Sequence, residues 1–192
     1  MRIIAGQFRS RILHAPRGLD VRPTGDRLRE TLFNVLAPRV TGSVCLDLYA
    51  GSGAVGIEAL SRGAREAIFV EHAESSLRAI RANLAALGIR GGYALEPRNV
   101  AAALPRLLEA GRTADLVFLD PPWAAPFRAD DQYALALGLL GSDCRALLAP
   151  GALVIAEHEK RRALDDRYGA LARYRLLQQG DAALSFYRIQ PN

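Results

Sequence analysis

Residues 44–56 read VCLDLYAGSGAVG, an apolar run that ends in a glycine-rich turn. Gly51, Gly53 and Gly56 have the spacing that joins a β-strand to the N-terminus of a helix in doubly wound α/β sheets. Glu71 follows Gly51 by twenty residues and ends the next predicted strand, where a carboxylate can bind two ribose hydroxyls. The pattern predicts a cofactor site at the carboxyl ends of parallel strands.

Asp47 separates this loop from a nicotinamide-binding loop. The corresponding position in such loops is normally apolar, because a pyrophosphate needs only backbone amides and a helix N-terminus. A carboxylate suits a cationic ligand instead, and S-adenosylmethionine carries an ammonium and a sulfonium group. The loop therefore favours S-adenosylmethionine as cofactor. The alternative without a ligand is that Asp47 caps a strand end and the glycines make a tight turn.

Short apolar runs alternate with amphipathic stretches from residue 43 onward. Runs such as Leu116–Leu119 are apolar throughout, as expected of parallel strands that are buried on both faces. We expect strands at residues 44–48, 67–70, 93–95, 116–119 and 153–156, with helices that start near Ala54, Glu74, Val100 and Asp130. Residues 173–177 and 183–189 flank Gly180-Asp181 and predict an antiparallel hairpin at one edge.

An N-terminal extension, residues 1–42, precedes this predicted domain of residues 43–192. Residues 2–5 and 11–15 are separated by a turn at Gly6 and predict a small basic hairpin. We expect Asp26 to cap a helix that runs to about Leu36 and is ended by Pro38.

Positive charge is concentrated in the extension. The net charge is +5 and the sequence pI is about 9.7. Residues 1–30 contain seven Arg against three acidic residues, so four of the five net positive charges lie there. We expect this cluster to contact the phosphates of a nucleic acid, and the alternative is a solvated face. The candidate RNA-binding residues are Arg9, Arg11, Arg17, Arg22 and Arg27.

The remaining composition is that of an ordinary globular protein of 192 residues. Cys45 and Cys144 lie far apart in the sequence, and the three His show no metal-ligand spacing, so we expect no metal site. No signal peptide or membrane-spanning run is expected. We therefore expect a cytoplasmic monomer.

A second motif, Asp120-Pro121-Pro122-Trp123, follows the fourth predicted strand. The prolines fix the backbone and remove two amide donors, which leaves carbonyl oxygens as rigid acceptors. The Asp120 carboxylate and the Pro121 carbonyl can accept the two N–H groups of an exocyclic amino group, so that its lone pair points at a methyl donor. Trp123 can stack on a base that has been flipped out of its helix. As a structural alternative, the segment is a proline-rich turn with a core Trp.

Both motifs resemble class I methyltransferases that modify base amino groups. The N-terminal sequence is similar to that of the RsmD family, guanine-N2 methyltransferases of small-subunit (16S) rRNA, and the resemblance covers essentially the whole chain. It rests on residues 1–6 (MRIIAG), 22–24 (RPT), 26–30 (DRLRE) and 32–34 (LFN). The resemblance implies a Rossmann-like methyltransferase fold with a mostly parallel seven-stranded sheet. It also implies S-adenosylmethionine as donor, and a guanine (guanine-966 in the family) flipped out of rRNA in a ribosomal subunit or assembly intermediate.

Two positions depart from the pattern of that family. Trp123 stands where Tyr or Phe is usual, and Asn99 stands where many class I enzymes have an Asp near the adenine amino group. Asn99 is equally well explained as a helix N-cap. The expected cofactor-binding residues are Asp47, Tyr49, Gly51, Gly53, Glu71, Asn99 and Asp120.

Three other functions are considered for this sequence. A DNA adenine-N6 methyltransferase would use the same two loops, but the expected sheet leaves only the 42-residue extension for recognition. A nicotinamide oxidoreductase does not account for Asp47 or for the segment that begins at Asp120. A non-enzymatic RNA-binding protein leaves that segment without a role.

Overall fold

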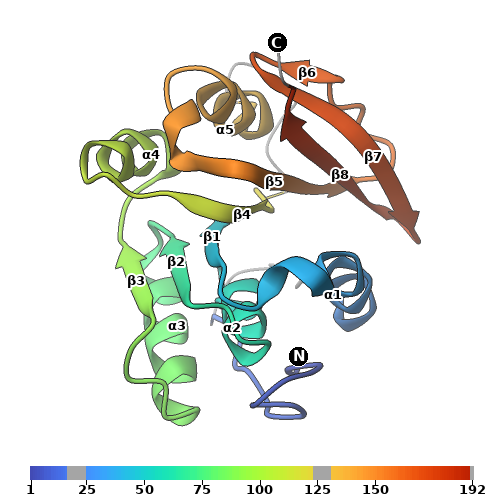
Figure 1. Cartoon of the computed structure of the whole chain (residues 1–192). Coiled ribbons are helices and arrows are strands. Elements are labelled where there is room, and N and C mark those ends of the chain that lie inside the picture. The colour runs from blue at the N-terminus through green and yellow to red at the C-terminus, as the bar shows by residue number, and fades with distance from the viewer. Residues whose placement is uncertain (17–24, 123–130, 191–192) are drawn as a thin grey trace.

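One mixed β-sheet organises residues 1–16, 25–122 and 131–190, which are those that the computed structural model describes (Figure 1). Its eight strands are hydrogen-bonded in the order β3-β2-β1-β4-β5-β8-β7-β6. They are β1 (Val44–Leu48), β2 (Glu66–Val70), β3 (Tyr93–Glu96), β4 (Ala114–Leu119), β5 (Leu148–Glu159), β6 (Arg167–Tyr168), β7 (Leu171–Gln179) and β8 (Ala182–Ile189).

The first five strands are parallel, and the last three are antiparallel to their neighbours. The doubly wound sheet and the C-terminal hairpin predicted from the sequence are confirmed. The sheet has eight strands where seven were expected, because Arg167 and Tyr168 pair with the start of β7 and add a two-residue edge strand. Such a short strand has no periodicity that a sequence pattern can reveal.

Helices cover both faces of the sheet (Figure 1). The helices are α1 (Asp26–Val40), α2 (Ala54–Ser61), α3 (Glu74–Ala86), α4 (Val100–Glu109) and α5 (Gln132–Gly141), with a 3-10 turn η1 (Arg145–Leu147). Side chains of α1, α2 and α3 are buried with one set of strand residues, whereas those of α4 and α5 are buried with the alternate set. Successive strand side chains therefore enter opposite layers of the core.

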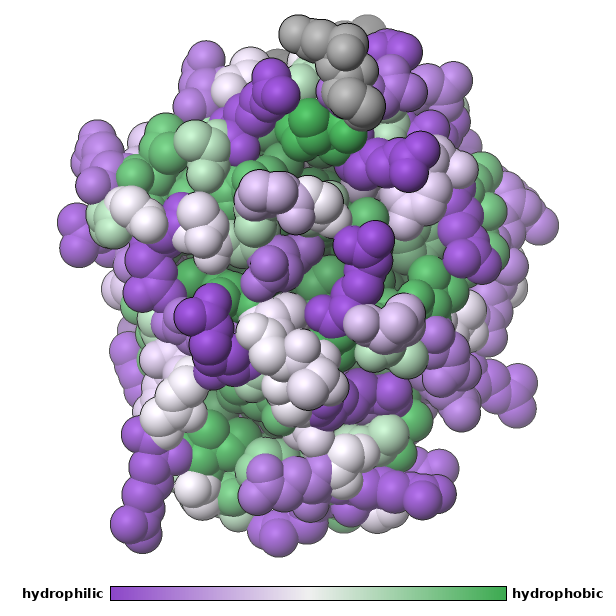
Figure 2. All heavy atoms as spheres, in the orientation of Figure 1, coloured by the Kyte–Doolittle hydropathy of each residue, from purple (hydrophilic) through white to green (hydrophobic). Residues whose placement is uncertain are grey.

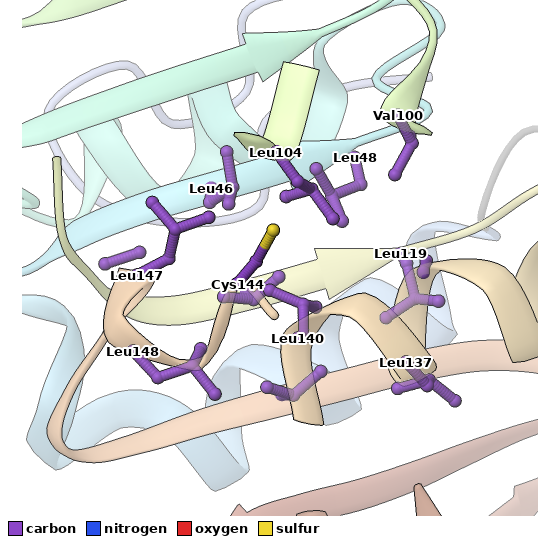
Figure 3. Close-up of a cluster of buried hydrophobic side chains, with 14 of the residues drawn as sticks. Leu46, Leu48, Val100, Leu104, Leu119, Leu137, Leu140, Cys144, Leu147 and Leu148 are labelled. Atoms are coloured by element: carbon purple, nitrogen blue, oxygen red, sulfur yellow. The ribbon is translucent and has the colours of Figure 1, made fainter. Parts of the chain in front are cut away.

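The layer beneath α4 and α5 is formed mainly by leucine side chains from strands and helices (Figure 3). Cys144 lies in this layer as a buried free thiol. Hydrophilic side chains cover much of the face in Figure 2, with apolar residues in small groups between them. No helix in the described part of the chain is long and apolar enough to cross a membrane.

Two expectations for α1 are wrong. The helix continues through Pro38 to Val40, because Leu36 and Val40 are buried against the sheet and hold the last turn in place. Asp26 is the first helical residue and does not cap it. Its carboxylate instead binds the Arg29 guanidinium at 3.0 Å.

The N-terminal segment forms a short hairpin with one antiparallel bridge, between Arg2 and Ile12. Its backbone binds α2: the Glu58 carboxylate accepts hydrogen bonds from the amides of Ile4 at 2.8 Å and Ala5 at 3.0 Å. Gly6 has φ of +84°, and a Cβ atom there would lie 1.8 Å from the Ser61 carbonyl oxygen. Only glycine permits this approach, so the hairpin docks closely on the end of α2.

Candidate active site

The two sequence motifs meet at the carboxyl edge of the sheet, which is the end where the parallel strands have their carboxyl ends. β1 lies between β2 and β4, and Leu48 is level with both Val70 and Leu119. The glycine loop, Glu71 and Asp120 follow these strands directly, so all three lie at the carboxyl ends, where open α/β sheets bind ligands.

The glycine loop is held in a backbone conformation that few residues adopt. Tyr49, Gly51 and Gly53 have φ of +59°, +56° and +77°, and Gly53 is the N-cap of α2. A Cβ atom on Gly56 would lie 2.3 Å from Cε1 of Phe69, so α2 packs on β2 more closely than any side chain would allow. A left-handed tyrosine is strained, and such strain is common at ligand-binding loops.

Asp47 is buried beneath this loop. Its Oδ2 accepts a hydrogen bond of 2.9 Å from the Gly56 amide. Burial raises the pKa of the Asp47 carboxyl to about 8, with the Gly56 bond lowering it and the charges of Asp120 and Glu71 adding to the rise. Asp120 directly follows β4, the strand that pairs with β1, so the acids of the two motifs lie at the same end of neighbouring strands. A cationic ligand would relieve this unfavourable burial of negative charge.

Glu71 fixes the loop from the other side. Its Oε2 accepts a bond of 2.9 Å from the Gly51 amide, and its Oε1 accepts bonds of 2.8 Å from the amides of His72 and Ala73. A carboxylate has about four acceptor positions, so one remains. In this conformation the Glu71 carboxylate can accept a hydrogen bond from one ribose hydroxyl. The sequence predicted bonds from two.

Asn99 is the N-cap of α4. Its side chain accepts a hydrogen bond of 2.9 Å from the Ala102 amide, and the residue is exposed. The capping interpretation is confirmed. The amide nitrogen of the side chain is not used by that bond, so the expected role in cofactor binding stays a prediction.

The segment that begins at Asp120 is described as far as Pro122. Asp120 is half-buried, Pro121 is buried and Pro122 is exposed. No donor in the described part of the chain binds the Pro121 carbonyl oxygen. That oxygen is therefore available as an acceptor beside Asp120. The predicted stacking residue Trp123 lies outside the described residues.

Three residues that were not predicted from the sequence hold the chain where α5 begins. Asp131 caps this helix through the amides of Tyr133 and Ala134, and its carboxylate binds Arg162 at 2.8 Å. The Arg162 guanidinium lies 4.6 Å over the Tyr133 ring, whose hydroxyl donates to the Glu157 carbonyl at 2.8 Å. Asp131 before an apolar helix was a capping signal in the sequence, but its pairing with Arg162 was not, because the two residues lie far apart in the chain.

Asn83 is a second buried residue that the sequence did not single out. Its side chain binds both the amide and the carbonyl of His14, at 2.9 and 3.0 Å, and donates to the Ser52 carbonyl at 3.0 Å. Because Ser52 belongs to the glycine loop, Asn83 joins the N-terminal hairpin to the candidate cofactor site.

Two of the candidate RNA-binding arginines, Arg9 and Arg11, lie in the N-terminal hairpin, and Arg27 lies in the first turn of α1. Arg9, Arg11 and Arg27 are exposed, whereas Arg17 and Arg22 lie outside the described residues. The Arg11 guanidinium donates to the Ala86 carbonyl at the end of α3. Ala86 lies three residues after Asn83, whose side chain contacts the glycine loop, so Arg11 is within about one helical turn of a residue that contacts the candidate cofactor site.

Comparison with known proteins identifies the family of the chain. A family model described as Conserved hypothetical protein 95 matches residues 1–188. The chain belongs to this family, the RsmD family. The resemblance drawn from the N-terminal signature and the two loops is confirmed.

Individual relatives agree with RsmD family membership. Ribosomal RNA small subunit methyltransferase D of Haemophilus influenzae is 35% identical over 100% of this chain and 94% of that protein. The solved structure of yhhF from Escherichia coli is 34% identical, with a TM-score of 0.79, and covers 100% of this chain and 99% of that one. A more distant structure, 16% identical with a TM-score of 0.68 over 84% of this chain and 49% of that one, is complexed with SAH. The fold is the α/β methyltransferase fold.

Proposed function

We propose that this protein transfers a methyl group from S-adenosylmethionine to the 2-amino group of a guanine in 16S rRNA. The observation that carries the proposal is the meeting of the two motifs at the carboxyl edge, where their acids lie at the same end of neighbouring strands. A donor held by the glycine loop and a base held by Asp120 would then be neighbours. The rRNA substrate is supported by the name of the Haemophilus influenzae relative.

The residues present fit S-adenosylmethionine. The acidic pair Asp47 and Glu71 suits a cation, and the close packing of Gly53 and Gly56 on Phe69 sets the position of the loop. Tyr49 and Gly51 complete the loop, and the side-chain nitrogen of Asn99, at the start of α4, has no partner in the described part of the chain. The neighbour complexed with SAH, the demethylated product, supports the same cofactor.

Bound S-adenosylmethionine would supply an electrophilic methyl group. The exocyclic nitrogen of guanine is a weak nucleophile because its lone pair is delocalised into the ring. Asp120 and the Pro121 carbonyl would accept its two N–H groups and orient the lone pair, while Pro122 keeps the segment rigid and Trp123 stacks on the flipped base. A strong base is unnecessary, because the methylated ammonium loses its proton readily to solvent or to Asp120.

RNA would also bind away from the pocket. Arg9, Arg11 and Arg27 are exposed and can neutralise phosphates, and Arg17 and Arg22 are proposed for the same role from the sequence alone. The Arg11 guanidinium already donates to the Ala86 carbonyl, so a phosphate contact would use its remaining N–H groups. We propose a small ribosomal subunit or an assembly intermediate as the substrate and a monomer as the active form.

Two measurements test this function. Calorimetry with S-adenosylmethionine and NAD, side by side, should show binding of the first alone. Transfer of a tritiated methyl group should then be measured with 16S rRNA, small subunits and duplex DNA. We expect label in rRNA or in subunits. Binding of NAD alone, or label in DNA alone, would contradict the proposal.

A further inference from the structure

A basic segment follows β5 at the carboxyl edge. Residues 159–162 read Glu-Lys-Arg-Arg, and Lys160 is the single lysine of the chain. β4 and β5 are parallel neighbours, with Leu119 level with Ala156, so Asp120 is level with the residue after Ala156. Lys160 lies three residues further along, which is roughly 10 Å beyond the level of Asp120. The basic segment therefore lies beyond the level of Asp120, at the carboxyl ends of the parallel strands.

The backbone of this segment is held on both sides. The Lys160 amide donates to the Asp181 carbonyl at 2.7 Å, and the Arg162 amide donates to the Glu159 carbonyl at 2.9 Å. The Arg162 side chain is committed to Asp131. These contacts fix where the side chains of the two preceding residues begin.

Lys160 and Arg161 are exposed, and their charged groups make no ion pair or hydrogen bond with any residue of the described chain. Arg162 differs from them, because its guanidinium is paired and stacked on Tyr133. Arg162 therefore anchors the segment, whereas the charged groups of Lys160 and Arg161 are exposed to solvent.

Acidic residues lie at the same end of the sheet as Lys160 and Arg161, and this affects how RNA can bind there. Glu71 and Asp120 follow β2 and β4 at this end of the sheet, and negative charges repel a polyanion. A base can enter the pocket only if the phosphates on either side of it come to the carboxyl edge. Arg11 is already engaged, because its guanidinium donates to the Ala86 carbonyl at the end of α3.

We propose that Lys160 and Arg161 form a basic rim that binds the RNA phosphates on either side of the target base. The proposal rests on the proposed rRNA substrate. It says which side chains contact the rRNA phosphates closest to the target base. Arg162 acts as a positioning residue for this rim, because it ties the segment to Asp131 at the start of α5.

The test compares two double variants that remove the same charge from opposite edges of the sheet. Lys160→Gln with Arg161→Gln removes the rim. Arg90→Gln with Arg145→Gln removes two exposed cations that precede β3 and β5 and so lie at the amino ends of the strands. Equilibrium binding to a 16S rRNA fragment is measured across a salt series for each protein. Methyl transfer to small subunits is measured in parallel, with S-adenosylmethionine affinity by calorimetry as the fold control.

For the rim variant, the slope of log K against log[salt] should flatten by about 1.4 to 1.8, and affinity should fall on the order of tenfold at low salt. KM for RNA should rise with little change in kcat, since phosphate contacts act before and during transfer alike. The control variant should keep a slope close to that of the wild type. Equal changes in both variants, or none in either, would overturn the rim.

The two proposals fail separately. If the rim variant alone loses RNA affinity but the wild-type protein transfers no methyl group, the rim stands as an RNA contact and the proposed function fails. If the wild type methylates rRNA and the rim variant has the same RNA affinity and salt dependence as the control variant, the proposed function is supported. The proposed phosphate contacts of Lys160 and Arg161 are then wrong.

Discussion

Asp47 is the residue whose ionisation should report cofactor binding. Its pKa is raised to about 8 mainly by burial, so the carboxyl is largely protonated at neutral pH before the ligand binds. Pairing with a cationic ligand favours the carboxylate, so binding should release a proton. Affinity for S-adenosylmethionine should therefore rise with pH up to about 8, by at most about tenfold per pH unit.

Calorimetry at pH 6.5 in two buffers of different ionisation enthalpy measures this proton directly. Asp47→Asn should bind more weakly and release none. The raised pKa also means that the folded protein without ligand binds more protons than the unfolded chain. Its free energy of unfolding should thus fall as pH rises from 3.8 to about 8, and less so in Asp47→Asn. Equal proton release by the two proteins would show that Asp47 does not face the ligand.

Removal of either loop carboxylate should weaken the cofactor site. Asp47→Ala and Glu71→Ala each remove charge-assisted hydrogen bonds, for which a loss of about 1.5–3 kcal/mol is expected. Dissociation constants for S-adenosylmethionine measure this loss, and circular dichroism controls for folding. Glu71→Ala should show the larger loosening of the loop, because its carboxylate binds three backbone amides. Unchanged affinity in both variants would mean that the ligand binds elsewhere.

Asp120 should matter for transfer and little for cofactor affinity. Asp120→Ala leaves one N–H group of the substrate without its acceptor, so we expect kcat to fall roughly 10²- to 10³-fold, as when one aligned hydrogen-bonding group is lost elsewhere. Single-turnover transfer at saturating cofactor measures this. Trp123→Phe should keep most activity and Trp123→Ala little, because only the first retains a ring for stacking. Near-normal turnover of Asp120→Ala would rule out this mechanism.

At the scale of elements, the docking of the hairpin on α2 can be tested at Gly6. Gly6 and Gly42 have φ of +84° and +77°, but a Cβ atom on Gly6 meets the Ser61 backbone, whereas one on Gly42 meets nothing within 4 Å. Gly42→Ala should cost only about 1–2 kcal/mol of left-handed strain. Gly6→Ala adds a clash with backbone that must shift, so it should cost more.

Chemical denaturation of the two glycine variants measures this difference. Gly6→Ala should also weaken S-adenosylmethionine binding, because Asn83 joins the hairpin to the Ser52 carbonyl. Equal stability of Gly6→Ala and Gly42→Ala would show that the hairpin does not dock in this way.

The elements themselves were mostly predictable from the sequence. Strands such as Leu116–Leu119 are apolar throughout because both faces are buried, and that pattern is local. The course of α1 was not predictable, because the burial of Val40 outweighs the break expected at Pro38. The position of Arg29 was also hidden. It is fully buried and binds the Arg2 carbonyl and Asp26, and no local pattern distinguishes it from the exposed arginines of the extension.

At the scale of the whole molecule, the sequence located the glycine loop and the segment that begins at Asp120 but not the charges around them. The two motifs were predictable because each follows its strand directly, and the parallel topology brings strand ends together. The clustering of arginines in residues 1–30 suggested a single RNA-facing patch. In the fold, the Arg11 guanidinium donates to the Ala86 carbonyl and Arg29 is buried, while Lys160 and Arg161 follow β5 at the carboxyl ends of the parallel strands. The position of a charged side chain in space depends on the topology of the fold, and the amino-acid composition does not reveal that position.

The central claim is that the carboxyl edge holds a methyl donor and a guanine amino group together. The most direct test is transfer of labelled methyl from S-adenosylmethionine to small ribosomal subunits, followed by digestion of the rRNA and identification of the labelled nucleoside. Wild-type protein should yield N2-methylguanosine as the labelled product, and Asp120→Ala should yield little of it. A labelled product other than N2-methylguanosine, or equal yields from the two proteins, would contradict the account.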